Sequence, residues 1–334
     1  MAVAVALAVF DAAGQQLPGG VQPGQIERQF ERPREPRRPA QPAVPPAPEQ
    51  RRPADAGDVR FVLRSIGVQG ATVYGEAALR EAYADLIGKE VSLDRIYDIA
   101  EALTRRYRND GYILSQVVVP SQVIGDGTVR LQAIEGYVAE IRIAGDPGDA
   151  WPTIEQTLAP IKQSRPLRAD VLERSLLLVN DLAGISARAT LARSAQPGAS
   201  DLTVSVAQAK RQFGIGLNNR GSRFLGPWRA NADADFFGLA ASGDRAGLRL
   251  VRTIQDDELT YVTGAYDSPI GASGLKFGLT ASAVEAHPTG GAALPPDLET
   301  RSSSFAATLG YALVRSRTGN VSARATFSSY NGKT

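Results

Sequence analysis

The chain has 334 residues, with 37 Lys and Arg against 35 Asp and Glu, and this balance lacks the clustered basic charge of nucleic-acid-binding domains. It contains no Cys and one His, His287, which excludes disulfides, thiolate metal sites and a Cys nucleophile and leaves little material for His chemistry. No apolar run reaches the roughly 18 residues of a membrane-spanning helix, so any membrane role requires strands. The length favours two or three structural units.

The N-terminal region divides into an apolar start and a long polar segment. Residues 1–13 resemble the apolar part of a secretory signal peptide, although a basic n-region is missing and the cleavage site around Ala12–Gly14 is poor. This start is either a signal-peptide remnant or an ordinary apolar terminus. Residues 14–57 are rich in Pro, Gln, Arg and Glu, which predicts a disordered, extended linker, with a short helix around 25–30.

Residues 58–136 predict a compact unit with the order β-α-α-β-β. An alternating segment at 60–68 favours a strand, and an apolar face over 76–87 favours a helix that Gly88 ends. Ser92 is the expected N-cap of a second helix that stops at 109–111. Two strands at 113–119 and 128–134 complete the unit.

The same order of elements recurs in residues 137–209. A strand at 138–144 precedes a short helix at 151–159 and a longer helix at 168–182, and strands at 186–193 and 202–207 close the unit. An internal repeat of this kind indicates two copies of one supersecondary module in tandem.

Residues 210–334 lose the helical pattern and alternate in segments of about ten residues, as membrane β-barrels do. One face of these segments is apolar and the other carries charges and hydroxyls. Tight turns such as 315–320 alternate with long connections such as 287–300. We expect about seven strands between Gln212 and Tyr330. Because an open half-barrel would leave two unpaired edges in lipid, we interpret the sequence as C-terminally truncated.

The repeated unit resembles a POTRA domain. The resemblance rests on the helix end at 106–112, the Val-rich segment 113–120 and the segment 131–136. More narrowly, the pair of units behind a Pro-rich linker resembles the outer-membrane transporters of two-partner secretion systems (the TpsB, or hemolysin-activator, family). This resemblance implies an α+β fold of tandem POTRA domains followed by the N-terminal part of an antiparallel transmembrane β-barrel.

The resemblance also implies a partner and a place where it binds. An extended, secreted client protein of the hemolysin or adhesin type would add itself by main-chain hydrogen bonds to an exposed strand edge. The barrel would lie in the outer membrane, in contact with its lipid, and the POTRA domains would lie in the periplasm. The implied edge residues are Ile113, Leu114, Ser115, Gln116, Val117, Val118 and Val119 in the first unit and Ala187, Arg188, Ala189, Thr190 and Leu191 in the second.

Motifs for chemistry are weak, and we expect no catalysis, cofactor, metal or small-molecule substrate. Residues 273–276 fit the S-x-x-K pattern but enter a strand, whereas that catalytic motif needs a helix. Residues 214–216 lack the third glycine of a dinucleotide site. Asp233 and Asp235 are interpreted as lumen-facing charges and residues 256–257 as a solvated loop.

Two other functions remain open from the residues alone. A barrel-assembly factor would use similar modules, although such proteins usually carry more POTRA copies. A soluble periplasmic binding module with a β-sandwich tail would also alternate along its strands.

Overall fold

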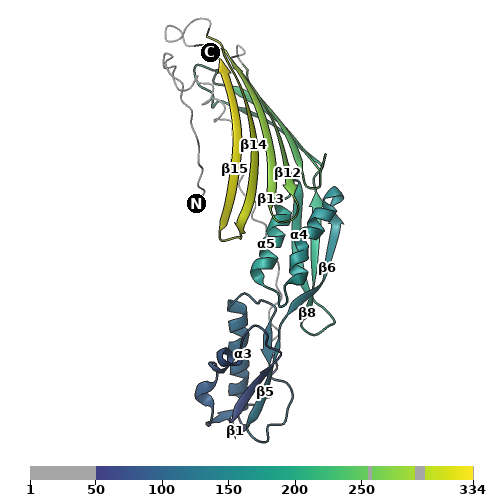
Figure 1. The fold of residues 1–334 in the computed structure, drawn as a ribbon, viewed down its shortest axis with the longest axis vertical. Helices are drawn as coiled ribbons and strands as arrows, with labels where there is room; N and C mark the ends of the chain where they lie inside the picture. Colours follow the sequence, from purple (N-terminus) through teal and green to yellow (C-terminus); the bar gives the residue numbers. More distant parts are fainter. Residues whose placement is uncertain (1–49, 255–257, 290–297, 334) are drawn as a thin grey trace.

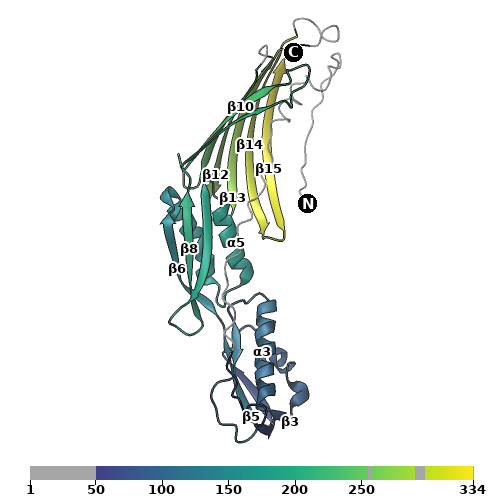
Figure 2. The same cartoon turned by 180° about the vertical axis from the view of Figure 1, so that it is seen from behind.

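The computed structural model describes residues 50–254, 258–289 and 298–333. Two α+β units follow one another along the long axis of the molecule, and a curved sheet of long strands continues from the second unit (Figure 1). The view from behind shows the same succession, with β8 leading from the second unit into the sheet (Figure 2). The predicted signal-peptide remnant, the helix at 25–30 and residues 256–257 lie outside the described residues.

The first unit is built on α3, whose limits agree with the prediction. The Ser92 side chain accepts a hydrogen bond from the Arg95 amide, and the helix ends at Asn109. Its apolar stripe, which includes Ile96, Leu103 and Tyr107, is buried against the sheet. The elements of this unit are β1 (Arg60–Val62), β2 (Ser65–Gln69), α2 (Glu76–Arg80), the 3-10 helix η2 (Ala84–Leu86), β3 (Glu90–Ser92), α3 (Leu93–Asn109), β4 (Gln116–Val118) and β5 (Thr128–Ile134).

Two predicted elements of this unit are divided in the structure. The strand expected over 60–68 is broken at Leu63, which is fully buried, so that β1 pairs with β3 and β2 pairs in parallel with β5. The helix expected over 76–87 ends at Arg80 because Tyr83 leaves helical geometry and buries its ring. The Tyr83 hydroxyl donates to the Ile66 carbonyl at 3.0 Å, which fixes this turn to the sheet.

The second unit repeats the arrangement around its own core. Its sheet has the order β6-β8-β7, matching β2-β5-β4, with one parallel and one antiparallel pair in each. The short helix extends to Gln163, past the expected end at 159, and includes Pro160. The elements are β6 (Tyr137–Asp146), the 3-10 helix η3 (Gly148–Ala150), α4 (Trp151–Gln163), α5 (Ala169–Asn180), β7 (Ile185–Arg193) and β8 (Ala199–Gln208). No helix within the described ranges is long and apolar enough to cross a membrane.

Seven strands then form one antiparallel meander in sequence order, as the alternating segments predict. They are β9 (Arg211–Asn218), β10 (Arg229–Phe237), β11 (Arg245–Thr253), β12 (Leu259–Ile270), β13 (Leu275–Ala286), β14 (Thr300–Arg315) and β15 (Asn320–Lys333).

The two faces of this sheet differ in chemistry. Ile215 and Leu250 both flank Ala232 on one apolar face, and Ile215 is 93% exposed. On the other face Asp233 pairs with Arg249 at 2.5 Å, and Arg245 bridges Asp235 and Asp267. An apolar face behind a charged one is the pattern of a barrel wall between lipid and a wet lumen.

Candidate protein-binding edges

Both segments that the sequence implied as client-binding edges reach the edge of a sheet. In the first unit β4 is an outer strand beside α3, and in the second unit β7 is an outer strand beside α5. The second segment agrees with the expected residues. The first is much shorter than expected, because only residues 116–118 of the predicted strand at 113–119 form β4.

The outward-facing backbone of the first edge already has hydrogen-bond partners. The Thr104 hydroxyl on α3 accepts from the Val117 amide at 2.8 Å and lies 3.3 Å from its carbonyl oxygen. Val119 lies two residues after Val117. The Gln50 side chain accepts a hydrogen bond from its amide at 2.9 Å and donates one to its carbonyl at 2.6 Å. Since every second residue of an edge strand faces outward, these two side chains satisfy the edge from 117 to 119.

Residues Ile113, Leu114 and Ser115 join the two units and do not form a strand. The first two pack against the core of the second unit, and the buried Ser115 hydroxyl accepts from the Gly136 amide at 3.2 Å. A side chain at Gly136 would start 2.4 Å from the Leu114 carbonyl oxygen, so the crossing chains require glycine there. The expected edge is shorter because its first residues are used in this crossing.

A carboxylate anchors the same crossing on the first unit. Glu135 accepts hydrogen bonds from the Thr72 amide at 2.7 Å, the Val73 amide at 3.0 Å and the Tyr107 hydroxyl at 2.8 Å. Burial alone would raise the pKa of Glu135, but a hydrogen bond from the Thr72 hydroxyl together with these donors outweighs it and lowers the pKa below the ordinary value. Burial, together with the bond to Glu135, raises the pKa of Tyr107.

The second edge is satisfied at one end and open along the rest. The Asn180 side chain at the end of α5 accepts from the Ala187 amide at 2.9 Å and donates to its carbonyl at 3.1 Å. Alternation then turns the amides and carbonyls of Ala189 and Leu191 outward. Within the described part of the chain, no hydrogen bond reaches these outward groups. The Arg188 and Thr190 side chains beside them are exposed.

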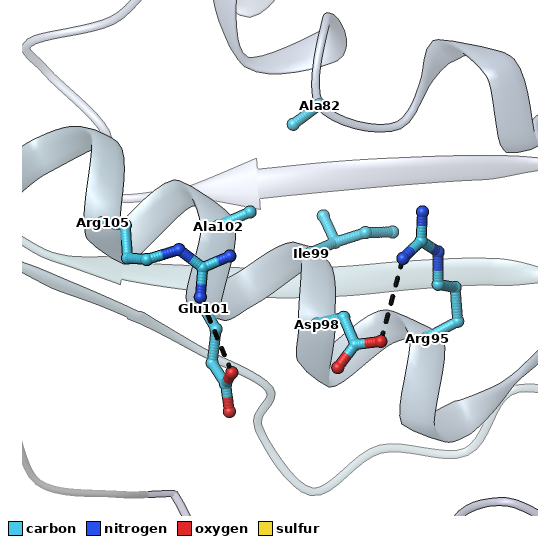
Figure 3. A pocket seen from close by; sticks show the side chains of 7 residues that line it. All are labelled: Ala82, Arg95, Asp98, Ile99, Glu101, Ala102 and Arg105. Atoms are coloured by element: carbon cyan, nitrogen blue, oxygen red, sulfur yellow. Dashed lines mark ion pairs between the residues drawn. The ribbon is translucent and has the colours of Figure 1, made fainter.

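The exposed face of α3 carries carboxylates in helical spacing. Figure 3 shows Asp98 beside Arg95 and Glu101 beside Arg105 around a shallow depression. The depression is lined by these paired charges together with Ile99 and two alanines, and its lining includes no nucleophile or imidazole. The depression is therefore a charged contact surface. The apolar stripe that predicts α3 describes only the buried face of the helix and does not indicate this exposed face.

The second unit docks onto turns of the seven-stranded sheet through contacts that the sequence did not indicate. Arg315 makes two hydrogen bonds of 2.7 Å to the Asp181 carboxylate, and these side chains are only 4% and 14% exposed. Arg174 on α5 donates to the carbonyls of Ser273, Ala312 and Leu313. The partners are more than 90 residues apart in the chain, so no local pattern could reveal them.

The motifs that mimic chemistry have structural partners. Ser273 lies in the turn before β13, where its carbonyl accepts from Arg174, and Lys276 donates to the Asp181 carbonyl at 2.8 Å. The S-x-x-K residues therefore belong to the docking contact. Asp233 and Asp235 form ion pairs with Arg249 and Arg245 on the charged face of the sheet.

Comparison with known proteins identifies the first unit directly. Residues 61–136 match the model of the ShlB-type POTRA domain. With this domain and the relatives below, the chain is similar to outer-membrane transporters of the TpsB/Omp85 family. Among curated relatives, the heme/hemopexin transporter protein HuxB of Haemophilus influenzae strain 86-028NP is 28% identical over 198 residues, which are 59% of this chain and 35% of HuxB. The outer membrane transporter CdiB of Escherichia coli is 23% identical over 177 residues, 53% of this chain and 30% of that protein. The chain thus spans about a third of the length of these relatives.

Solved structures share the fold. CdiB from Escherichia coli superposes with a TM-score of 0.62 at 17% identity, covering 85% of this chain and 54% of that one. CdiB from Acinetobacter baumannii gives a TM-score of 0.54 at 15% identity, covering 92% and 60%. The fold is therefore POTRA-like α+β units followed by a seven-stranded antiparallel sheet that corresponds to part of the CdiB barrel.

Proposed function

We propose that the full protein of which this chain is a part lies in the outer membrane and exports a secreted partner protein, with the two α+β units in the periplasm. The relatives named as transporters support this function, as does the sheet with one apolar and one charged face. The partner is an exoprotein that arrives in extended form, and the protein acts as a transporter and not as an enzyme. We further propose that residues 58–136 and 137–209 are its two POTRA domains.

The client is held by strand addition at the open part of the β7 edge. Ala189 and Leu191 present outward amides and carbonyls, which an extended client can pair with whatever its side chains are. Their side chains face the core, so the edge presents mainly backbone groups and places little constraint on the sequence of the client. The edge belongs to the unit that leads directly into the sheet, since β8, the partner of β7, ends at Gln208 and β9 begins at Arg211.

Ala189→Pro tests this edge with little damage to the fold. Proline removes an amide that the sheet does not use, and edge strands tolerate it for that reason. We expect export of the partner exoprotein by the full-length protein to fall about tenfold in Ala189→Pro, the factor for losing one or two backbone hydrogen bonds. The control Ala189→Val keeps the amide and should export normally. Equal export by both variants would refute capture at this edge.

A further inference from the structure

The segment from Gln50 to Ala56, here called the strap, is bound along the first unit although its composition predicts linker. Ala56 is 1% exposed, and its carbonyl accepts from the Asp94 amide at the start of α3. At the other end Gln50 holds both polar backbone groups of Val119. The strap therefore runs beside α3 from Val119, just after β4, to the N-terminus of the helix.

Arg52 fixes the middle of the strap by charge. Its guanidinium lies 3.3 Å from Asp94, 2.9 Å from Asp98 and 2.6 Å from Glu101, and it stacks 5.8 Å from the ring centre of Tyr97. The carboxylates stand at helical positions i, i+4 and i+7, so one arginine reaches all three along a single face of α3. Two of them are the carboxylates of the charged depression in Figure 3.

The contact at Val119 imitates a strand. A glutamine side chain carries the same amide donor and carbonyl acceptor as a peptide group, and both are used on Val119, the residue that follows β4. An added strand would have to form these same two bonds, because Val119 faces outward beyond Val117, whose own bonds go to Thr104.

We propose that the strap closes the end of the β4 edge at Val119, so that an extended chain can pair there only after Gln50 and Arg52 are displaced. This inference rests on the proposed function, in which clients bind by strand addition. It assigns the two edges different states: β7 is open, and β4 is closed by the protein's own chain. An extended segment that displaces the strap would need to replace two contacts. One of its residues would pair with Val119 in place of Gln50, and a basic residue two positions later would contact the α3 carboxylates in place of Arg52. Because the carboxylates are about half exposed, salt should also loosen the strap.

Hydrogen exchange of the chain in detergent micelles tests whether the strap holds the edge, without any client. Gln50→Ala should speed exchange of the Val119 amide roughly tenfold, and Arg52→Ala should act in the same direction. Gln122→Ala is the matched control, because Gln122 holds the amide and carbonyl of Arg130 on β5 through the same pair of contacts. That variant should leave Val119 unchanged. Unchanged exchange at Val119 in Gln50→Ala would overturn the proposal.

Binding of a fluorescein-labelled alternating Thr-Val octapeptide tests whether the strap excludes a strand. In an Ala189→Pro background, which closes β7, the peptide should bind at least about tenfold more tightly once Gln50→Ala and Arg52→Ala are added. Equal weak binding with and without the strap substitutions would overturn it. If the peptide binds the unsubstituted chain but not Ala189→Pro, binding at the β7 edge is supported independently of the strap. If Ala189→Pro does not alter binding, the proposed β7 capture fails, while exchange at Val119 still decides the strap.

Discussion

The ion pair between Asp181 and Arg315 should determine whether the second unit stays docked on the sheet. Removing Asp181 by substitution to Ala leaves a guanidinium that is 4% exposed without its carboxylate. Breaking one partner of such a pair costs about 3–5 kcal/mol. Arg315 keeps a hydrogen bond of 2.9 Å to Asn320, which favours the lower figure. At about 1.4 kcal/mol per factor of ten, docking should weaken roughly a hundredfold.

Trypsin cleavage at Lys210 and Arg211 reports this change, because Lys210 lies between β8 and β9, Arg211 is the first residue of β9, and both are exposed. In the docked state the Lys210 carbonyl accepts from the Phe237 amide at 3.0 Å, which holds the site in the fold. We expect much faster cleavage in Asp181→Ala. The control is Asp170→Ala on the same helix, whose pair with Arg168 is exposed and contributes under about 1 kcal/mol.

A second substitution separates the charge argument from simple loss of contact. Asp181→Ala combined with Arg315→Met removes the buried charge along with its partner, and such replacements are often neutral. The double variant should resist trypsin nearly as well as the original chain. Cleavage of the single variant at the original rate, or no recovery in the double variant, would refute the reasoning.

Three further predictions concern the first unit and its join. Gly136→Ala should lower stability by about 1–3 kcal/mol in thermal or denaturant unfolding, because its side chain meets the Leu114 carbonyl; an unchanged midpoint would contradict the close approach. Thr104→Val should cost about 1–3 kcal/mol by leaving the Val117 amide unpaired, with faster exchange of that amide as the direct readout. The lowered pKa of Glu135 contributes stability that is present above its ordinary pKa near 4.5 and is lost as pH falls through the folded value. Glu135→Gln should therefore flatten the loss of stability that denaturant titration measures between about pH 5 and 3. An unaltered pH profile would exclude this carboxylate as a source of the acid sensitivity.

The elements that the sequence predicts well are those with strong local patterns. Ser92 and the apolar stripe of α3 define that helix because a cap and a 3.6-residue period act within a few turns. The seven strands follow from alternation, since each must show one face to an apolar and one to a polar environment. The tandem order of elements is equally local, because each helix and strand of the repeat follows from its own short pattern.

The candidate site was predicted only in part, because its state depends on contacts distant in sequence. Nothing near Val119 indicates that Gln50 will satisfy it from 69 residues away. The composition of residues 50–57 predicts a linker, yet Arg52 finds three carboxylates on a folded helix and binds there. The strand expected at 113–119 is shortened by the crossing at Gly136, a packing event between units. Alternation identifies an edge strand, but only tertiary contacts decide whether that edge is open.

Photo-crosslinking during export tests the central claim most directly. A benzoyl-phenylalanine placed at Thr190 of the full-length protein lies on the exposed side of the open edge, and one placed at Gln116 lies on the closed edge. The exported exoprotein should crosslink to position 190 and not to position 116, and Ala189→Pro should weaken the crosslink about tenfold. Crosslinking at 116 alone, or a crosslink at 190 that Ala189→Pro does not weaken, would contradict capture by strand addition at β7.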